Sequence, residues 1–206
     1  MIDFKIQHPE KEYIMPNIDL LSMHKQFLNN HIKKGGIVAD FTMGNGHDTA
    51  WLAEAVGEEG HVYAFDIQQA ALDSTRARLE EAGLADRCTL ILDSHANALE
   101  YIHEPICAGV FNLGYLPGGD RTKTTLHEST RIAVEAAISL VDRDGIILVA
   151  VYPGHEEGAR EREALLDWAQ NLDDRRFDAM LKTYLNQPNN PPLMLAVRKK
   201  KTKGKI

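Results

Sequence analysis

A run of small and polar residues follows the first strongly apolar segment of the chain and has the composition of a ligand-binding loop. It includes Asp40, Gly44, Asn45, Gly46 and His47. The two glycines lack the β-carbons that would keep a ligand away from the backbone, and they permit a positive-φ turn into a helix. We expect the Asp40 carboxylate to bind either this loop or the ammonium group of a ligand. A tight strand-to-helix turn without a ligand is the simpler interpretation of the glycines alone.

Two more polar turns follow at the spacing that an adenosine ligand requires. Asp66 ends the second apolar run 20 residues after Gly46. A carboxylate at that position accepts hydrogen bonds from the two hydroxyls of a ribose. Asp93, Ser94 and His95 end the third apolar run, and we expect this turn to lie within reach of the adenine edge.

A dinucleotide-binding oxidoreductase would have the same first glycines and the same ribose-binding carboxylate. Its glycine fingerprint continues to a third small residue, whereas this chain has Thr49 at that position. The sequence also shows no second nucleotide-binding half. We therefore predict S-adenosyl-L-methionine as the cofactor rather than a nicotinamide dinucleotide.

The segment after the fourth apolar run, Phe111 to Asp120, is rich in residues that shape a loop. Asn112 and the backbone carbonyls after it can accept hydrogen bonds from an amine and orient its lone pair toward a methyl group. Tyr115 is placed to stack on a nucleobase or to face a sulfonium. The segment resembles the Asn-Pro-Pro-Tyr signature of methyltransferases that modify amino nitrogens, although Leu113 and Gly114 replace both prolines. A simple turn at Asn112 and Gly114 is the alternative.

A second candidate for proton transfer follows the fifth apolar run, within Tyr152 to Glu157. His155 could remove a proton from an ammonium nucleophile or contact the substrate. The same residues also fit the start of a helix, with two carboxylates near its positive dipole end. For Glu156 and Glu157 we favour the helix start, whereas for His155 both interpretations stay open.

Short apolar runs alternate with amphipathic segments from about residue 37 onward, which is typical of βα units around a parallel sheet. The runs are continuously apolar, as expected where helices cover both faces. The turn-rich segment Gln187 to Pro192 predicts that the last two strands form an antiparallel hairpin at one side of the sheet. The seven expected strands are Ile37 to Phe41, His61 to Asp66, Cys88 to Leu92, Ile106 to Asn112, Gly145 to Tyr152, Phe177 to Leu185 and Leu193 to Arg198.

The expected helices have recognisable ends. The helix from Gln68 to Ala82 should close at Gly83 with a left-handed cap, and Thr125 to Glu128 has the spacing of a capping box. A helix is also expected from Glu156 to Leu172. The helix from about Ile18 to His31 precedes the sheet, and we expect it to cover the cofactor side.

Composition agrees with one α/β domain spanning residues 1–206, because 44% of the residues are hydrophobic and 26% are charged. No apolar stretch approaches the roughly 18 residues of a membrane span, and the N-terminus lacks an apolar secretion segment. We therefore expect a cytoplasmic protein without a membrane partner. Cys88 and Cys107 lie in apolar runs and are expected to be buried, reduced thiols. No metal-ligand spacing occurs, so no metal is expected.

The net charge of −7 argues against a surface covered in phosphate contacts, but the charge is unevenly spread. Six of the nine residues in the segment 198–206 are basic. Such a tail could bind nucleic acid, and it could equally be a solvated terminus.

With these segments considered together, the chain resembles the rRNA methylase family of class I methyltransferases. Bacterial members of this family include the enzyme that completes 5-methylaminomethyl-2-thiouridine at the tRNA wobble position. The resemblance runs from Met15 to the final expected strand. Its most specific marks are Thr42-Met-Gly-Asn-Gly-His-Asp-Thr49, Asn112-Leu-Gly-Tyr-Leu-Pro-Gly-Gly-Asp120 and Tyr152-Pro-Gly-His-Glu-Glu157.

The resemblance implies a Rossmann-like fold with a seven-stranded, mostly parallel sheet. It also implies methyl transfer to the primary amine of an aminomethyl group on uridine 34, with the tRNA anticodon stem-loop as partner and a homodimer as assembly. Asp120, Tyr115 or His155 would accept or relay the amine proton, a choice that the sequence leaves open. The matching positions that would surround the cofactor are Asn45, His47, Asp48, Thr49, Asp66, Gln68, Ser94 and His95.

An acidic protein is an unusual partner for tRNA, because phosphate contacts supply much of the affinity for nucleic acids. Unstacked anticodon bases can also be bound by stacking on aromatic side chains. Three alternatives stay open: an rRNA methyltransferase, a small-molecule amine N-methyltransferase, and a non-catalytic adenosine- or RNA-binding module. The Asn112 loop argues against the last of these. A local basic rim near the ligand side or the N-terminal helix would comprise Lys5, Lys11, Lys25, Lys33, Lys34, Arg121 and Lys123.

Overall fold

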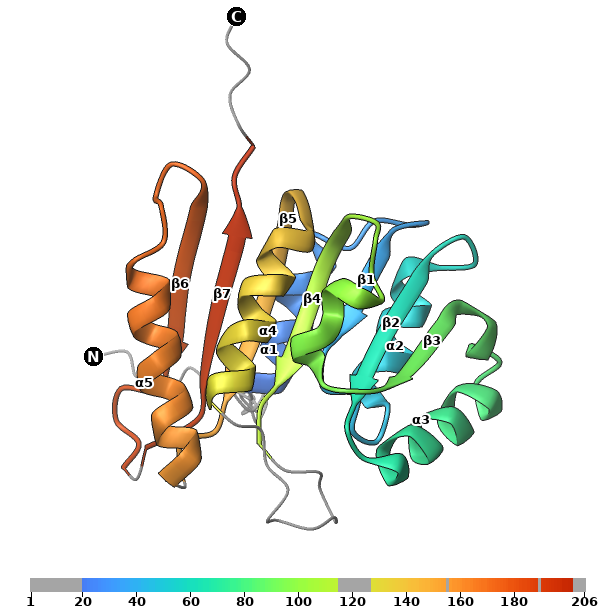
Figure 1. Cartoon of the computed structure of the whole chain (residues 1–206), viewed down its shortest axis with the longest axis horizontal. Helices are drawn as coiled ribbons and strands as arrows, with labels where there is room; N and C mark the ends of the chain where they lie inside the picture. Colours follow the sequence, from blue (N-terminus) through green and yellow to red (C-terminus); the bar gives the residue numbers. More distant parts are fainter. Residues whose placement is uncertain (1–19, 115–126, 155, 189, 202–206) are drawn as a thin grey trace, which may run out of the picture.

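The computed structural model describes residues 20–114, 127–154, 156–188 and 190–201. Within them, seven strands form one sheet in the order β3-β2-β1-β4-β5-β7-β6 (Figure 1). Strands β1 to β5 are parallel, and β7 runs antiparallel to both of its neighbours. The strands are β1 (Ile37–Asp40), β2 (His61–Asp66), β3 (Cys88–Leu92), β4 (Ile106–Asn112), β5 (Val141–Val151), β6 (Phe177–Thr183) and β7 (Leu193–Lys199). The predicted mostly parallel sheet and its closing hairpin are thus confirmed.

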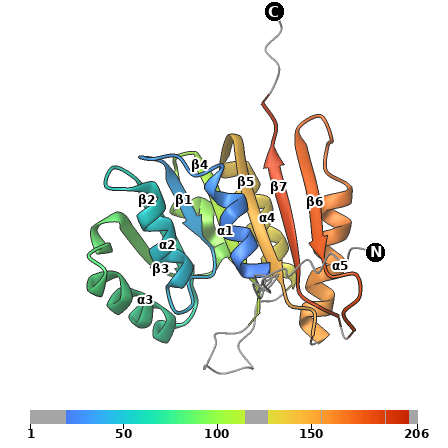
Figure 2. The same cartoon turned by 180° about the vertical axis from the view of Figure 1, so that it is seen from behind.

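Helices cover both faces of the sheet, which explains why the central strands are apolar along their whole length. On one face, Val134 of α4 and Leu165 of α5 pack in one core with Phe111 of β4. On the other face, shown in Figure 2, Leu28 of α1 and Leu52 of α2 pack in a second core. The helices are α1 (Leu20–Asn29), α2 (His47–Val56), α3 (Gln69–Glu81), α4 (His127–Leu140) and α5 (Glu156–Gln170).

Two features of the fold were not predicted. Strand β5 begins at Val141, before the expected Gly145, because three polar residues in its first part hide the strand pattern. The pairing with β4 is irregular there, and Asp144 has φ 67°. Two short 3-10 helices, η1 (Ala85–Arg87) and η2 (His95–Glu100), flank β3 and lack the periodicity that would identify them.

Several other helix and strand ends differ from the expected ones by one or two residues, and Thr125 of the expected capping box lies outside the described residues. Gly83 follows α3 with φ 67°, as a left-handed cap requires. Cys107 is buried and Cys88 is half-buried, and neither forms a disulfide. Burial raises the pKa of the Cys88 thiol to about 11. None of the described helices combines the length and apolarity that crossing a membrane would demand.

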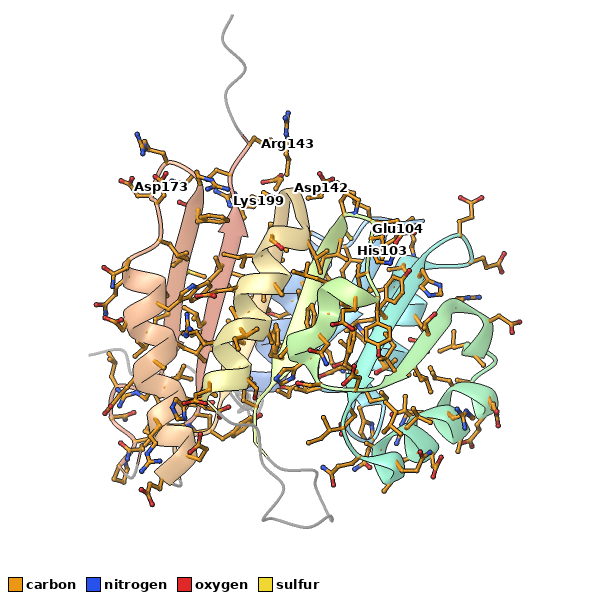
Figure 3. The ribbon with its side chains drawn as sticks, in the orientation of Figure 1. His103, Glu104, Asp142, Arg143, Asp173 and Lys199 are labelled. Carbon is orange, nitrogen blue, oxygen red and sulfur yellow. The ribbon has the colours of Figure 1, made fainter. Side chains whose placement is uncertain are left out.

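The parallel strands align the candidate site residues at one edge of the sheet. Asp40 pairs in register with Ala64 of β2 and Val110 of β4, so the carboxyl ends of β1, β2 and β4 are nearly level. Charged side chains gather at the opposite edge, where Figure 3 shows Asp142 and Lys199. In an open α/β sheet, ligands bind beyond the carboxyl ends of the strands. The candidate site therefore lies away from the start of the basic tail.

Candidate active site

The Asp40 side chain holds the loop that follows β1. Its side chain has no solvent exposure. Thr49 Oγ1 donates to Asp40 Oδ2 at 2.6 Å, and the Thr42 N–H donates to Asp40 Oδ1 at 3.1 Å. Burial, with a further contribution from the nearby Asp48 carboxylate, raises the pKa of Asp40 to about 7. Of the two predicted roles, loop binding is the one that the geometry displays.

Gly44 and Gly46 both have positive φ, at 51° and 76°. A β-carbon on Gly46 would lie 2.9 Å from Cα of Thr75 on α3. Close packing of the loop on α3 is therefore one reason for a glycine at this position. The Thr75 hydroxyl also donates to the Gly44 carbonyl at 3.0 Å.

Arg78 of α3 fastens the middle of the same loop. Its Nε donates to the Asn45 carbonyl at 2.8 Å, and its Nη2 lies 3.2 Å from His47 Nε2. His47 is exposed at the start of α2, which has no side-chain cap. The positive end of the α2 dipole therefore faces the carboxyl edge of the sheet, where it favours a negatively polarised group.

The Asp66 carboxylate connects the loops after β1 and β2. Oδ2 accepts a hydrogen bond from the Gly44 N–H at 3.1 Å, and Oδ1 accepts one from the Gln68 N–H at 3.0 Å. Each carboxylate oxygen can accept a second hydrogen bond, so the group retains capacity for the hydroxyls of a ribose. Burial raises the pKa of Asp66 above its ordinary value. Ile67, the next residue, is 62% exposed and offers an apolar surface that sequence reasoning did not identify.

The turn after β3 is held by its own side chains. Asp93 accepts hydrogen bonds from Asn97 Nδ2 at 3.1 Å and from the Tyr101 hydroxyl at 2.8 Å. Ser94 caps η2 by accepting from the Ala96 N–H at 3.2 Å. These contacts fix the shape of the turn, in which Asp93 and Ser94 are half-buried.

His95 links this turn to β1. Its Nδ1 lies 3.0 Å from the Phe41 carbonyl oxygen, and its ring meets that of Phe111 edge to face. Burial lowers the pKa of His95, which favours the neutral ring. His95 is therefore placed to hold the third turn against the first, and it presents little surface to a ligand.

Asn112 joins the end of β4 to the glycine loop at two points. Its backbone N–H donates to Thr42 Oγ1 at 2.7 Å, and its Nδ2 donates to Asp48 Oδ2 at 2.6 Å. Its Oδ1 is buried and has no hydrogen-bond partner among the described residues. The next two residues continue along the edge of the site. The Leu113 N–H donates to the Ala150 carbonyl, and Gly114 has φ 133°.

Helix α1 contributes Lys25, which was expected in a basic rim, and His24, which the sequence did not reveal as part of the site. Lys25 Nζ lies 3.3 Å and His24 Nε2 lies 3.5 Å from Asp48 Oδ1. Lys25 also lies over the Trp51 ring, 5.3 Å from its centroid. Burial alone would raise the pKa of Asp48, but His24, Lys25 and the Asn112 amide together hold it below its ordinary value. These contacts place helix α1 beside the start of α2 at the carboxyl edge.

Three predicted catalytic residues, Tyr115, Asp120 and His155, lie outside the described residues. Glu156 and Glu157 start α5, which confirms the helix-start interpretation for these two residues. Glu157 Oε1 accepts from the His127 N–H at 2.8 Å and lies 2.7 Å from His127 Nδ1, so it caps α4. Among the residues that the structure describes, no cluster of His, Cys, Asp and Glu could hold a metal ion.

The basic residues that the structure describes do not form the expected rim around the site. Lys33 pairs with Asp142, and Lys34 donates to the Glu54 carbonyl, both at the opposite edge. Lys25 does lie at the site, but it is paired with Asp48. Lys5, Lys11, Arg121 and Lys123 lie outside the described residues.

The start of the basic tail is also paired at the opposite edge. Lys200 lies 2.8 Å from Asp178, and Lys201 lies 3.0 Å from Asp144. Arg198 contacts both of these carboxylates. The part of the tail within the described residues is therefore occupied by acidic neighbours, far from the carboxyl ends of β1 and β4.

Residues 62–198 match the family model described as "Putative rRNA methylase". A putative rRNA-methylase from Clostridium thermocellum shares 40% identity with a TM-score of 0.85, over 87% of this chain and 96% of that one. A putative methyltransferase from Streptococcus mutans, solved in complex with SAH, shares 36% identity with a TM-score of 0.79, over 87% and 97% of the two chains.

A curated relative extends the comparison to a defined substrate. The chloroplastic tRNA (mnm(5)s(2)U34)-methyltransferase of Arabidopsis thaliana is 34% identical over 178 residues. The match covers 82% of this chain and 65% of that protein. The chain thus spans just under two thirds of the length of this relative.

Proposed function

The chain belongs to the rRNA methylase family of class I S-adenosylmethionine-dependent methyltransferases, and we propose that it methylates the aminomethyl nitrogen of wobble uridine 34 in tRNA. The product would be 5-methylaminomethyl-2-thiouridine. The observation that carries the choice of an amine is the side chain of Asn112. Its oxygen is a buried acceptor without a partner among the described residues, at the carboxyl end of β4.

The residues at the carboxyl edge fit an adenosine-bearing methyl donor. Asp66 would accept hydrogen bonds from the ribose hydroxyls, because its two oxygens can together accept more hydrogen bonds than those from Gly44 and Gln68, and the side chain is only half-buried. The exposed Ile67 would cover one face of the adenine, with Ser94 at its edge and the buried His95 holding that turn in place. The SAH bound to the Streptococcus mutans relative supports this assignment.

Bound S-adenosyl-L-methionine would supply an electrophilic methyl group on a sulfonium. The chain's own task is to present a neutral amine in line with the bond from sulfur to methyl. Asn112 Oδ1 would accept a hydrogen bond from that amine and direct its lone pair toward the methyl carbon. An alkyl amine is mostly protonated at neutral pH, so a base must first remove a proton. Tyr115, Asp120 and His155 remain the candidates for this role.

The RNA partner is supported by the relatives rather than by the surface charge. The basic side chains among the described residues are mostly paired with acids. We therefore assign recognition of the anticodon loop to stacking on aromatic side chains and to the basic residues Arg121 and Lys123. A homodimer would double this surface, and a cytoplasmic location would bring it to tRNA. Both proposals rest on the family resemblance.

Mass spectrometry of tRNA nucleosides from cells that lack the protein tests the proposal. We expect 5-methylaminomethyl-2-thiouridine to disappear and its unmethylated aminomethyl precursor to accumulate. A normal tRNA profile with a missing methyl group in rRNA would favour the rRNA alternative. If both RNA profiles are normal, RNA is excluded as the substrate, and a small amine or a non-catalytic role would remain.

A further inference from the structure

The orientation of the Asn112 side-chain amide is fixed by its neighbour Asp48. An amide has one accepting oxygen and one donating nitrogen, whereas an ionised carboxylate can only accept. Because Asp48 Oδ2 lies 2.6 Å from Asn112 Nδ2, the nitrogen must face Asp48 and the oxygen must point away from it. The bond from the Asn112 N–H to Thr42 Oγ1 at 2.7 Å fixes the backbone below the amide.

An ionised Asp48 can only accept from Asn112, and helix α1 places the Lys25 ammonium and the His24 ring beside its carboxylate. Lys25 Nζ and His24 Nε2 lie 3.3 and 3.5 Å from its other oxygen, Oδ1. A protonated Asp48 could donate to Asn112 Oδ1, and the amide could then reverse. The pKa of Asp48 is below its ordinary value despite burial, which agrees with a carboxylate that remains an acceptor.

Two buried side chains in this group have unused polar atoms. His24 is 3% exposed, and neither of its ring nitrogens forms a hydrogen bond with the described residues. Asn112 Oδ1 is likewise buried and without a partner. Buried polar atoms are nearly always satisfied in folded proteins, so an unused acceptor at the carboxyl edge indicates that a ligand completes it.

We propose that Asp48, supported by His24 and Lys25, is a positioning residue that holds the Asn112 amide with its oxygen toward the methyl acceptor. The proposal rests on the proposed function for the identity of that acceptor, an amine. It assigns Asp48 to the acceptor side of the site rather than to the cofactor. It also gives α1 an indirect role in the reaction, because His24 and Lys25 act on Asp48 and Asp48 acts on Asn112 without touching the substrate.

The first test observes the amide directly and needs no substrate. The side-chain amide signal of Asn112 in a nitrogen-15 correlation spectrum is identified by its loss in Asn112→Ala. In Asp48→Asn this signal should shift, because the carboxylate that accepts from Nδ2 is gone. The matched control is Asp73→Asn, since Asp73 is an exposed residue of α3 whose partners in the described part of the chain are Gln69 and Arg76. An Asn112 signal that is the same in wild type and Asp48→Asn would overturn the proposal.

The second test separates positioning from cofactor binding. Asp48→Asn should lower kcat by about 10- to 100-fold, the size expected for a misplaced reacting group. The affinity for S-adenosylhomocysteine, measured by calorimetry, should stay within about threefold of wild type, since a factor of this size is under 1 kcal/mol. Asp48→Glu should recover part of kcat. A loss of cofactor affinity as large as the loss of kcat would instead place Asp48 at the cofactor.

A double variant decides whether the two residues act as one unit. If Asp48 acts only through Asn112, then Asp48→Asn should have little further effect on kcat in an Asn112→Ala background. If the fold losses in kcat of the two single variants multiply in the double variant, the proposal is contradicted. Failure of the proposed function is distinguishable, because a wild-type protein without activity on tRNA would still give a decisive result in the spectrum of Asn112.

Discussion

The Thr49 hydroxyl donates a 2.6 Å hydrogen bond to Asp40 Oδ2, and neither side chain is exposed to solvent. Thr49 lies on α2 and Asp40 ends β1, so this bond closes the loop between them. Because the loop lies at the carboxyl edge, its stability and the shape of the site depend on the same buried contact.

Thr49→Val should destabilise the protein by about 1–3 kcal/mol, because it leaves a buried carboxyl group without one of its donors. The free energy of unfolding, measured with urea, checks this value. Thr89→Val is the matched control, since Thr89 is exposed on β3 and its hydroxyl contacts the His61 ring. A change in the free energy of unfolding within about 0.5 kcal/mol is expected for this variant. Equal losses of unfolding free energy in the two variants would show that the bond to Asp40 stabilises the protein no more than an exposed one.

Titration of Asp40 should make the protein less stable as the pH rises. Its pKa is about 7 in the folded chain and 3.8 in a model peptide, so the unfolded state releases the proton first. The stability contribution of the neutral acid is present below about pH 4 and is lost by about pH 7. Asp40→Asn cannot titrate, so its stability relative to wild type should increase over this range and then level off.

Urea unfolding of both proteins at a series of pH values measures this difference. Other groups titrate in both proteins, so their contributions largely cancel in the comparison. Parallel curves across the range would show that Asp40 has the same pKa in the folded and unfolded states.

Gly46 and Gly83 provide a comparison between backbone strain and packing. Both have positive φ. A β-carbon at position 46 would lie 2.9 Å from Cα of Thr75, whereas a β-carbon at position 83 would have no other atom within 4 Å. Alanine in this conformation costs roughly 1–2 kcal/mol by itself. We expect Gly83→Ala to lose about this much stability and Gly46→Ala clearly more, together with weaker cofactor binding. Similar losses in both variants would mean that the loop can move away from α3.

Asp66→Ala should weaken S-adenosylmethionine binding at least about tenfold, which corresponds to about 1.4 kcal/mol. The variant removes the proposed ribose acceptor and the two hydrogen bonds that Asp66 accepts from Gly44 and Gln68. Calorimetry measures the affinity, with Asp86→Ala as a control because Asp86 is exposed before β3. An unchanged affinity would remove Asp66 from the cofactor site.

Much of the fold could be predicted because buried parallel strands leave a plain trace in sequence. Both ends of β2, β3 and β4 agree with the prediction to the residue. The glycine loop and Asp66 each follow or end a predicted strand, and this identified the carboxyl edge of the sheet. By contrast, the first residues of β5 are polar, so the strand signal begins too late there. Local pattern is sufficient where a strand is apolar along its length and insufficient where polar residues occupy one end, as at the start of β5.

The supporting contacts of the site could not be predicted, because they join residues far apart in the chain. Nothing in the local sequence of α1 indicates that His24 meets Asp48, and the packing of Gly46 on Thr75 depends on where α3 lies. The expected basic rim was wrong for Lys33, since its position near the N-terminal helix does not reveal which edge of the sheet it faces. Such pairings follow from the fold as a whole.

The central claim is tested most directly by incubating the purified protein with labelled S-adenosylmethionine and tRNA that carries 5-aminomethyl-2-thiouridine. We predict that the label appears in 5-methylaminomethyl-2-thiouridine at position 34, and that Asn112→Ala transfers far less of it while still binding S-adenosylhomocysteine. Label at another nucleotide, or no label from a protein that binds the cofactor normally, would contradict the account.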